Sequence, residues 1–195
     1  METESTLFQA REDYIWAVRR SFSLGLQAGT GGNISIRLAA GRFLTKPTGT
    51  GLVDCGGNDL VVVDEEGRAV EGNAKPTKEI QVHLAVFRVR ADVTCIVHYH
   101  APYATAYAVR GKALPLPTVH AKRILGTIPL LGEYPEGSDQ LAAAAAQAAV
   151  SPHIAGLLMK KHGLMAFGDT PRQAQYRAEL MEESARIAWL AHFIS

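Results

Sequence analysis

Apolar residues near the start of the chain recur at intervals of three and four, the period of an amphipathic helix. They are Ile15, Val18, Phe22 and Leu26. We expect this helix to stop at Gly29. A second such pattern fills residues 75–90, where the helix is expected to begin at Pro76 and Thr77. Its apolar face consists of Ile80, Leu84 and Phe87.

Three further helices are predicted from their end signals. One ends at Gly111, and another follows Ser138, a suitable N-cap. The last begins with Thr170 and Gln173 at the spacing of a capping box and with Pro171 at the first helical position. That helix is expected to run to the end of the chain.

Alternation of apolar and polar residues predicts strands between the helices. Ile34 and Ile36 alternate with Ser35 and Arg37, as in a half-buried strand. Other short strands are expected within residues 41–50, 60–72, 94–100 and 156–168, and residues 113–138, rich in proline and glycine, are expected to be part loop and part short strand. Because strands and helices alternate irregularly, a three-layer α/β arrangement with a mixed or antiparallel sheet is favoured.

The composition adds limits to this picture. The chain has 195 residues, 47% of them hydrophobic and 20% charged, and its mean hydropathy is +0.01. This is enough for a sizeable core, so a single domain over residues 1–195 is expected. The formal net charge is +1 without a run of Lys and Arg, so nucleic acid and membrane surfaces gain no electrostatic support as partners.

The cysteines and the start of the chain indicate the cellular compartment. Only Cys55 and Cys95 are present, which fits a reducing compartment. The acidic, polar start lacks the basic and apolar regions of a signal peptide, and no apolar run approaches the roughly 18 residues of a membrane helix. A cytoplasmic protein is therefore expected.

Two histidines one residue apart, His98 and His100, end the apolar run of residues 94–100. Side chains alternate between the faces of a strand, so these two point the same way, about 7 Å apart along the backbone. They can converge on one metal ion, and catalytic zinc is commonly held by three protein ligands. Taken alone, the pair fits two polar residues at a strand end equally well.

His162, followed by Gly163 in a strand-like apolar segment, is the candidate for a third ligand. From another strand it can reach the same end of the sheet. The alternative is a lone core or turn histidine. Cys95 faces away from His98 by strand parity and is not counted as a ligand.

Glu79 lies in the first turn of the helix that begins near Pro76, where the helix dipole favours a carboxylate whatever its function. The functional alternative is a general base. A carboxylate beside a metal-bound carbonyl substrate can take a proton from a carbon acid, because the metal stabilises the resulting enediolate. His83, four residues later on the same face, can orient Glu79 by a hydrogen bond.

Three segments can bind an anion, because they contain small residues or the start of a helix. They are residues 29–35, residues 46–50 and the helix start at Thr77 and Lys78. Each alone is a turn, and none matches the P-loop or the dinucleotide fingerprint. Together they predict a phosphate pocket. His120, in the proline-rich segment, is a candidate proton donor, whereas His153 and His192 are expected at the surface or in packing.

The motifs GTGGNISIR, KPTGT, KPTKE, VHYH and KHG, in this order, resemble the class II aldolase/adducin family from Tyr14 to about Phe193. Its members include L-fuculose-phosphate aldolase, L-ribulose-phosphate 4-epimerase and related lyases, dehydratases and decarboxylases. The resemblance implies an α/β/α sandwich with a largely antiparallel central sheet. It also implies a homotetramer with sites at subunit interfaces.

The resemblance also implies roles for individual residues. It assigns a zinc ion, or another divalent transition metal, to His98, His100 and His162, and the role of catalytic acid/base to Glu79. The residues implied for the substrate phosphate are Gly32, Asn33, Thr48, Gly49, Thr77 and Lys78.

The chain departs from the aldolase pattern in two places. Thr77 and Lys78 stand where two serines are common, and KPTKE is similar to the motif of four-carbon sugar-acid phosphate decarboxylases, although those tend to have asparagine at the position of Gly49. Of the two tyrosines that serve the aldolase as proton donors, the loop tyrosine is replaced around His120, and the C-terminal tail that carries the other is not expected here. The general acid is therefore unassigned.

The leading hypothesis is a zinc-dependent aldolase, a carbon–carbon lyase that cleaves a phosphorylated ketose by a retro-aldol reaction through a metal-stabilised enediolate. A 3-oxo-tetronate 4-phosphate-type decarboxylase or a pentulose-phosphate 4-epimerase on the same site is the alternative. A non-catalytic, adducin-like interaction module stays open as a different class. The partners expected are a phosphorylated sugar and further copies of the chain, with no nucleic acid and no membrane.

Overall fold

The computed structural model describes residues 2–194, and an eight-stranded sheet in the order β4-β3-β2-β1-β5-β8-β7-β6 lies at the centre of this part of the chain. The strands are β1 (Asn33–Arg37), β2 (Phe43–Thr45), β3 (Val61–Val63), β4 (Ala69–Glu71), β5 (Cys95–Tyr99), β6 (Leu130–Leu131), β7 (Gly156–Met159) and β8 (Gly163–Gly168). Only the pair β6 and β7 is parallel among these strands. The predicted, largely antiparallel sheet is confirmed.

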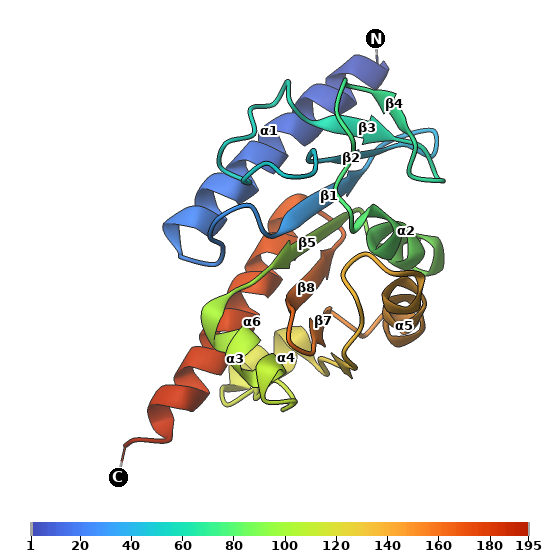
Figure 1. Ribbon diagram of the computed structural model, residues 1–195. Coiled ribbons are helices and arrows are strands. Elements are labelled where there is room, and N and C mark those ends of the chain that lie inside the picture. Colours follow the sequence, from blue (N-terminus) through green and yellow to red (C-terminus); the bar gives the residue numbers. More distant parts are fainter. Residues whose placement is uncertain (1, 195) are drawn as a thin grey trace.

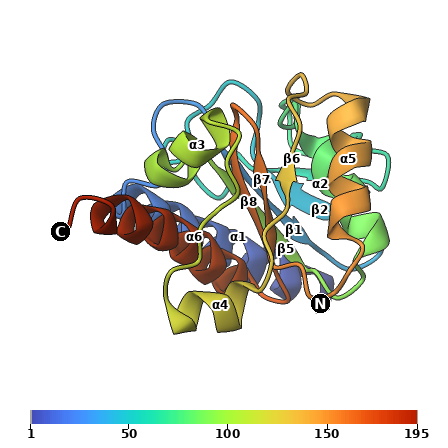
Figure 2. The same ribbon diagram turned by 90° about the horizontal axis from the view of Figure 1, so that it is seen from below.

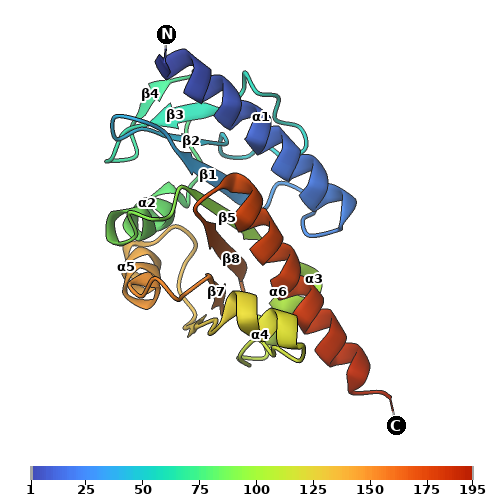
Figure 3. The same ribbon diagram turned by 180° about the vertical axis from the view of Figure 1, so that it is seen from behind.

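Helices cover both faces of the sheet, which gives three layers (Figures 1 and 2). One face carries α2 (Ile80–Val89) and α5 (Asp139–Ala149). The other carries α1 (Glu2–Ser23), α3 (Pro102–Val109), α4 (Val119–Leu125) and α6 (Pro171–Ala191). Figure 3 shows α1 and α6 lying across that second face. The α/β/α sandwich expected from the sequence is therefore the observed architecture.

Strand parity divides the interior into two cores. On β5, Cys95, Val97 and Tyr99 pack in the core shared with α1, α3 and α6, whereas Ile96 packs in the core shared with α2 and α5. Cys95 is thus on the face opposite His98, as predicted. The side chain of His98 consequently points toward the layer that contains α2.

The apolar face predicted for the first helix is wrong in part. The helix buries Ala10, Tyr14, Ala17 and Val18, while Phe22 is 59% exposed. The helix ends at Ser23, before the predicted stop at Gly29. Small alanines at two of the buried positions let the helix pack closely, and they carry little weight in a search for large apolar residues.

Strand β1 is buried on both faces, not half-buried as predicted. Helices on both sides of the sheet remove the solvent-facing side that the alternation suggested. Ser35 is accommodated by hydrogen bonds, because its hydroxyl donates to Thr45 Oγ1 at 3.2 Å and lies 2.7 Å from Nδ1 of His83. The His83 ring therefore contacts Ser35, and the predicted side-chain hydrogen bond from His83 to the Glu79 carboxylate is not among those found in residues 2–194.

Helix α4 is not predicted by the sequence, which suggests loop and short strand there. Thr118 caps it, since its side chain accepts a hydrogen bond from Ala121 N at 3.1 Å. Seven residues between prolines and a glycine show too little periodicity to be recognised.

The capping signals of the two later helices are largely confirmed. The Ser138 hydroxyl accepts from Leu141 N at 3.2 Å, and that of Thr170 accepts from Gln173 N at 3.2 Å. The second half of the capping box is shifted by one residue, because Gln173 Oε1 accepts from Asp169 N.

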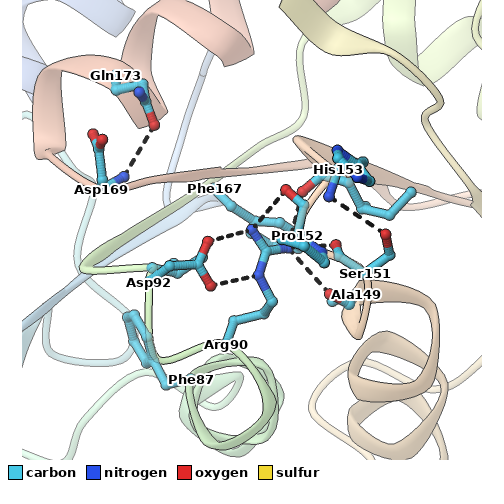
Figure 4. Close-up of polar contacts among 12 residues, drawn as sticks. Phe87, Arg90, Asp92, Ala149, Ser151, Pro152, His153, Phe167, Asp169 and Gln173 are labelled. Atoms are coloured by element: carbon cyan, nitrogen blue, oxygen red, sulfur yellow. Dashed lines mark hydrogen bonds and ion pairs between the residues drawn. The ribbon is translucent and has the colours of Figure 1, made fainter.

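The far ends of α2 and α5 are joined by Arg90, the C-cap residue of α2 (Figure 4). Its buried guanidinium donates to the carbonyl oxygens of Ala149, Ser151 and Ile154 at 3.0–3.1 Å. It also forms two hydrogen bonds of 2.7 and 2.8 Å with the carboxylate of Asp92. The carbonyl groups that end α5 thus receive donors from α2.

Across residues 2–194, no helix is both long enough and apolar enough to cross a membrane.

Candidate metal centre

Three histidines from distant parts of the chain meet at one end of the sheet. His98 is on β5, His100 directly follows that strand, and His162 lies in the turn between β7 and β8. One nitrogen of each ring lies within 4.8 Å of the others, and the Nε2 atoms of His98 and His100 are 3.1 Å apart. The structure therefore brings together the three residues that the sequence suggested as metal ligands.

The ring of His98 is oriented by the neighbouring strand. Its Nδ1 lies 2.8 Å from the carbonyl oxygen of Leu164 on β8. Because a carbonyl oxygen can only accept, Nδ1 carries the proton and Nε2 presents its lone pair to the cluster. Burial lowers the pKa of His98 to about 3, and burial followed by the charge of His162 lowers the pKa of His100. Neutral imidazole is the form that binds a metal.

The separation of these nitrogens fits a metal ion. Nitrogen ligands about 2.0–2.1 Å from a tetrahedral zinc ion lie about 3.3 Å from one another. The Nε2 atoms of His98 and His100, 3.1 Å apart, are already near this separation, and the nitrogen of His162 lies within 4.8 Å of both. The three histidines therefore fit the set of nitrogen ligands that would hold a catalytic zinc ion.

Glu79 is the N-cap residue of α2, one position before the helix and not in its first turn as predicted. Its carboxylate makes no capping hydrogen bond and turns toward the histidines. Oε2 lies 3.2 Å from Nε2 of His98, and Oε1 lies 3.2 Å from Nε2 of His162. Burial raises the pKa of Glu79, but the histidines and a hydrogen bond from Asn33 outweigh this and lower it to about 2. The carboxylate is therefore ionised at neutral pH.

Asn33, at the start of β1, is the direct partner of this carboxylate. Its Nδ2 donates to Glu79 Oε2 at 2.7 Å. Its Oδ1 is buried and has no hydrogen-bond partner among residues 2–194. Asn33 therefore contacts the candidate base and also keeps one amide hydrogen and one acceptor for a ligand.

Glycines leave the space into which the histidine rings fit. A Cβ on Gly31 would lie 2.7 Å from Nδ1 of His100, and one on Gly163 would lie 3.0 Å from Cδ2 of the same ring. Gly32 has a positive φ of 68°, and a Cβ there would lie 2.5 Å from Oε1 of Gln27. These contacts give a steric reason for glycine in both the GGN and the HG motif.

The other two predicted anion-binding segments lie side by side. Thr48 N donates to Lys75 O at 2.9 Å, and Thr77 N donates to Lys46 O at 2.9 Å. These two backbone N–H groups therefore form hydrogen bonds within the protein. Thr77 is buried while Lys78 is exposed, so an anionic ligand can reach the ammonium group of Lys78.

Lys46 joins the first and second of these segments. Its buried ammonium group donates to the carbonyl oxygens of Thr30 at 2.7 Å and Thr50 at 2.5 Å. Burial lowers the pKa of Lys46. A positive charge thus lies beneath the two loops that carry Gly32 and Gly49.

His120 does not join the cluster. It is exposed on α4, where it lines a groove of about 970 Å³ with residues of α6 such as Glu183, and the groove includes none of the three clustered histidines. His153 and His192 are exposed, as predicted.

Sequence reasoning missed three polar side chains near the site, Gln27, Lys46 and Glu182. Lys46 opens the KPTGT motif, but the motif by itself assigns no role to its side chain. Gln27 and Glu182 lie in predicted helical segments and carry no motif, so only their buried contacts reveal them.

Comparison with known proteins gives a family match over most of the chain. The family described as "Class II Aldolase and Adducin N-terminal domain" matches residues 12–189. The L-ribulose-5-phosphate 4-epimerase UlaF of Salmonella paratyphi B is 34% identical over 182 residues, which cover 88% of this chain and 80% of that protein.

Solved structures share the fold. The structure of YgbL from Klebsiella pneumoniae, described as a putative aldolase/epimerase/decarboxylase, superposes with a TM-score of 0.89 at 31% identity, covering 97% of this chain and 93% of the other. L-Fuculose-1-phosphate aldolase from Thermus thermophilus gives a TM-score of 0.84 at 26% identity, covering 94% of this chain and 95% of the other. The chain therefore belongs to the class II aldolase and adducin family, beside relatives that are named as sugar-phosphate aldolases and epimerases.

Proposed function

We propose that the protein is a zinc-dependent aldolase that cleaves a phosphorylated ketose between two carbon atoms. The observation that carries this proposal is the carboxylate of Glu79, which lies 3.2 Å from two of the three clustered histidines. A base at this distance from a metal site can reach the carbon atom next to a carbonyl group held there. His98, His100 and His162 would hold the ion.

A bound zinc ion would act as a Lewis acid that polarises the substrate carbonyl. Glu79, ionised at neutral pH, accepts a proton from the carbon next to that carbonyl in the direction of synthesis. In the direction of cleavage the bond to the departing aldehyde breaks, its electron pair stays on this carbon, and the acid form of Glu79 returns the proton. Asn33 holds the carboxylate in place through its 2.7 Å hydrogen bond.

The substrate phosphate is proposed to bind between the glycine loops. Gly32, Asn33, Thr48, Gly49, Thr77 and Lys78 are the residues proposed for it. The buried ammonium group of Lys46 supports an anion here, because a desolvated positive charge attracts it more strongly than an exposed one. Lys78 would add a charge from the exposed side.

The hydroxyl group of the departing aldehyde needs a second proton acceptor. His120 lies outside the cluster in its own chain, so it could serve only the site of another copy. A homotetramer with sites between subunits, located in the cytoplasm, is proposed on the family resemblance.

Epimerisation is the second candidate, favoured by the 34% identity to an L-ribulose-5-phosphate 4-epimerase. Decarboxylation of a 3-oxo sugar-acid phosphate is favoured by the KPTKE motif at residues 75–79. Like aldol cleavage, both reactions leave a negative charge on the carbon next to the carbonyl group. The three reactions differ in the group that leaves this carbon and in whether that group returns.

A panel of phosphorylated ketoses and 3-oxo sugar-acid phosphates, incubated with the zinc-loaded protein, separates these reactions. Release of triose phosphate without CO₂ supports the aldolase. A new pentulose epimer without triose phosphate supports the epimerase, and CO₂ supports the decarboxylase. No turnover of any compound by protein that holds zinc would contradict the proposal.

The Lys78→Ser variant tests the phosphate pocket. Loss of a charge–phosphate contact is expected to raise KM by about tenfold, or about 1.4 kcal/mol, with kcat nearly unchanged. Lys75→Ser is the matched control, since Lys75 is also exposed but is not proposed to contact the phosphate. An unchanged KM in Lys78→Ser would remove this residue from the pocket.

A further inference from the structure

The backbone of His100 lies beyond the regular part of the sheet. Strand β5 ends at Tyr99, and the last pair in its ladder with β8 joins Tyr99 and Leu164. His98 is held inside this ladder and by its own bond to Leu164 O. His100 has to be positioned by other contacts.

One such contact comes from Gln27, which follows α1 and is only 9% exposed. Its Oε1 accepts a hydrogen bond from His100 N at 3.0 Å, and its Nε2 donates to Ala28 O at 2.8 Å. The amide is also packed against Gly32, where a Cβ would lie 2.5 Å from Oε1. The side chain is therefore fixed at both ends and has no room to move toward the glycine loop.

The second contact comes from Glu182 on α6. Helix α3 begins two residues after His100, and its N-cap residue Ala101 has no side chain able to cap it. The carboxylate of Glu182 takes this place, because Oε1 accepts from Tyr103 N at 2.9 Å and Oε2 accepts from Ala104 N at 2.8 Å. An acidic group is stabilised at a helix N-terminus, so this contact fixes where α3 begins.

We propose that Gln27 and Glu182 are positioning residues of the metal centre, which hold the backbone before and after the side chain of His100 so that its ring faces His98 and His162. The inference rests on the proposed metal site. Within residues 2–194, neither side chain forms a hydrogen bond with an imidazole ring of the cluster. Gln27 acts through the main-chain N–H of His100, and Glu182 acts through the start of α3, which follows His100.

Metal affinity is the property that tests the proposal. Zn²⁺ and Co²⁺ affinities of the full chain are measured by competition with a chromogenic chelator, and the visible spectrum of the Co²⁺ form reports the ligand geometry. Gln27→Met removes the acceptor at nearly the same size, and Glu182→Gln replaces one of two acceptors by a donor. Loss of a group that orients a ligand is expected to weaken binding about tenfold or more in each variant, with an altered Co²⁺ spectrum.

Gln175→Met is the matched control. Gln175 is also buried, and its Oε1 accepts from the hydroxyl of Tyr99 at 2.7 Å, on the face of β5 opposite His98. This variant is expected to lose thermal stability as Gln27→Met does and to keep the affinity and spectrum of the wild type. The comparison separates loss of stability from loss of positioning.

Wild-type affinity and spectrum in Gln27→Met and Glu182→Gln would overturn the inference and leave the proposed function intact. Equal weakening in Gln175→Met would also overturn it, since the effect would then follow stability. A wild-type protein that binds neither ion would overturn the proposed function and the inference together. If Gln27→Met does not fold, Glu182→Gln decides the matter alone.

Discussion

The two ends of helix α2 carry buried charges that lie in different surroundings. At its start, Glu79 is 7% exposed, and at its end Arg90 is 3% exposed. Arg90 is surrounded by carbonyl oxygens and by the carboxylate of Asp92 (Figure 4). Glu79 faces histidines instead, and the nearby Asn33 Oδ1 and His83 Nε2 have no hydrogen-bond partner within residues 2–194.

This difference separates a charge with a structural role from one with a proposed functional role. A buried polar group is costly unless hydrogen bonds compensate it, and at Arg90 the protein itself supplies them. Near Glu79, acceptors and ring nitrogens are left for something that is not part of the chain. The end of the helix that is incompletely satisfied is where we expect a metal ion and a substrate to bind.

Glu79→Gln gives the largest expected effect and tests the functional end. Removing a general acid/base is expected to lower kcat by about 10²–10⁴-fold, because the amide cannot take up the proton. The rate is measured with the substrate that the panel identifies, at equal zinc content. Glu183→Gln, the same change at an exposed glutamate, is the control. Asn33→Asp is not suited as a control because it adds a charge. Full activity in Glu79→Gln would exclude Glu79 as the base.

Arg90→Met tests the structural end. The variant leaves the carbonyl oxygens at the end of α5 without their donor and Asp92 without its partner, so the free energy of unfolding is expected to fall by about 3–5 kcal/mol. Denaturant unfolding measures this loss. Arg90→Lys keeps the charge but not the fork of donors, and an intermediate loss is expected. A large drop in kcat of folded Arg90→Met would contradict the division between the two ends.

His83 allows the pH dependence of stability to be predicted. Burial lowers its pKa to about 4 from an ordinary value of 6.5, so the unfolded chain binds a proton below pH 6.5 that the folded chain refuses. The free energy of unfolding therefore decreases as pH falls from 6.5 to about 4, by roughly 3 kcal/mol from this residue. In His83→Asn, which cannot titrate, the decrease is expected to be smaller by that amount.

Unfolding of metal-free protein at a series of pH values measures this difference. The amide of asparagine can replace Nδ1 of His83 toward the Ser35 hydroxyl, which keeps the comparison fair. Parallel pH profiles in both proteins would show that His83 is not the source of the acid sensitivity.

Thr170→Ala gives the smallest expected effect. Thr170 caps α6 far from the cluster, and loss of the cap is expected to cost about 1 kcal/mol of stability. Metal affinity and kcat are expected to stay at wild-type values, which thermal melting, chelator competition and a rate assay would check. A change in metal affinity here would mean that the site responds to any loss of stability. It would contradict the division between a structural and a functional end of α2.

Much of the fold can be predicted because local rules decide it. The caps Ser138 and Thr170, the helix stop at Gly111 and the parity of β5 depend on contacts within a few residues, and the predictions for them are confirmed. The errors arise where a distant element decides. The alternation around Ser35 predicts a solvent-facing side chain, but α2, which covers it, begins 45 residues later.

The candidate site divides in the same way. His98 and His100 follow from the period of a strand, and His162 and Glu79 are candidates from their surroundings in the sequence. The contacts of Glu79 with Asn33 and two histidines follow only from the packing of α2 on the sheet. Gln27, Lys46 and Glu182 could not be found from the sequence, because ordinary polar residues give no signal until their partners are known.

The sequence by itself determined which residue types are available and which face of a strand or helix each occupies, because backbone periodicity is local. The histidine pair, the glycine loops and the layered architecture follow from it. Only the tertiary structure decided which of these groups share one buried space, since that depends on distant segments meeting at one end of a sheet, as Tyr103 and Glu182 do across 79 residues. Burial there lowers the pKa of His98, and the groups that surround Glu79, the histidines and Asn33, lower the pKa of its carboxyl.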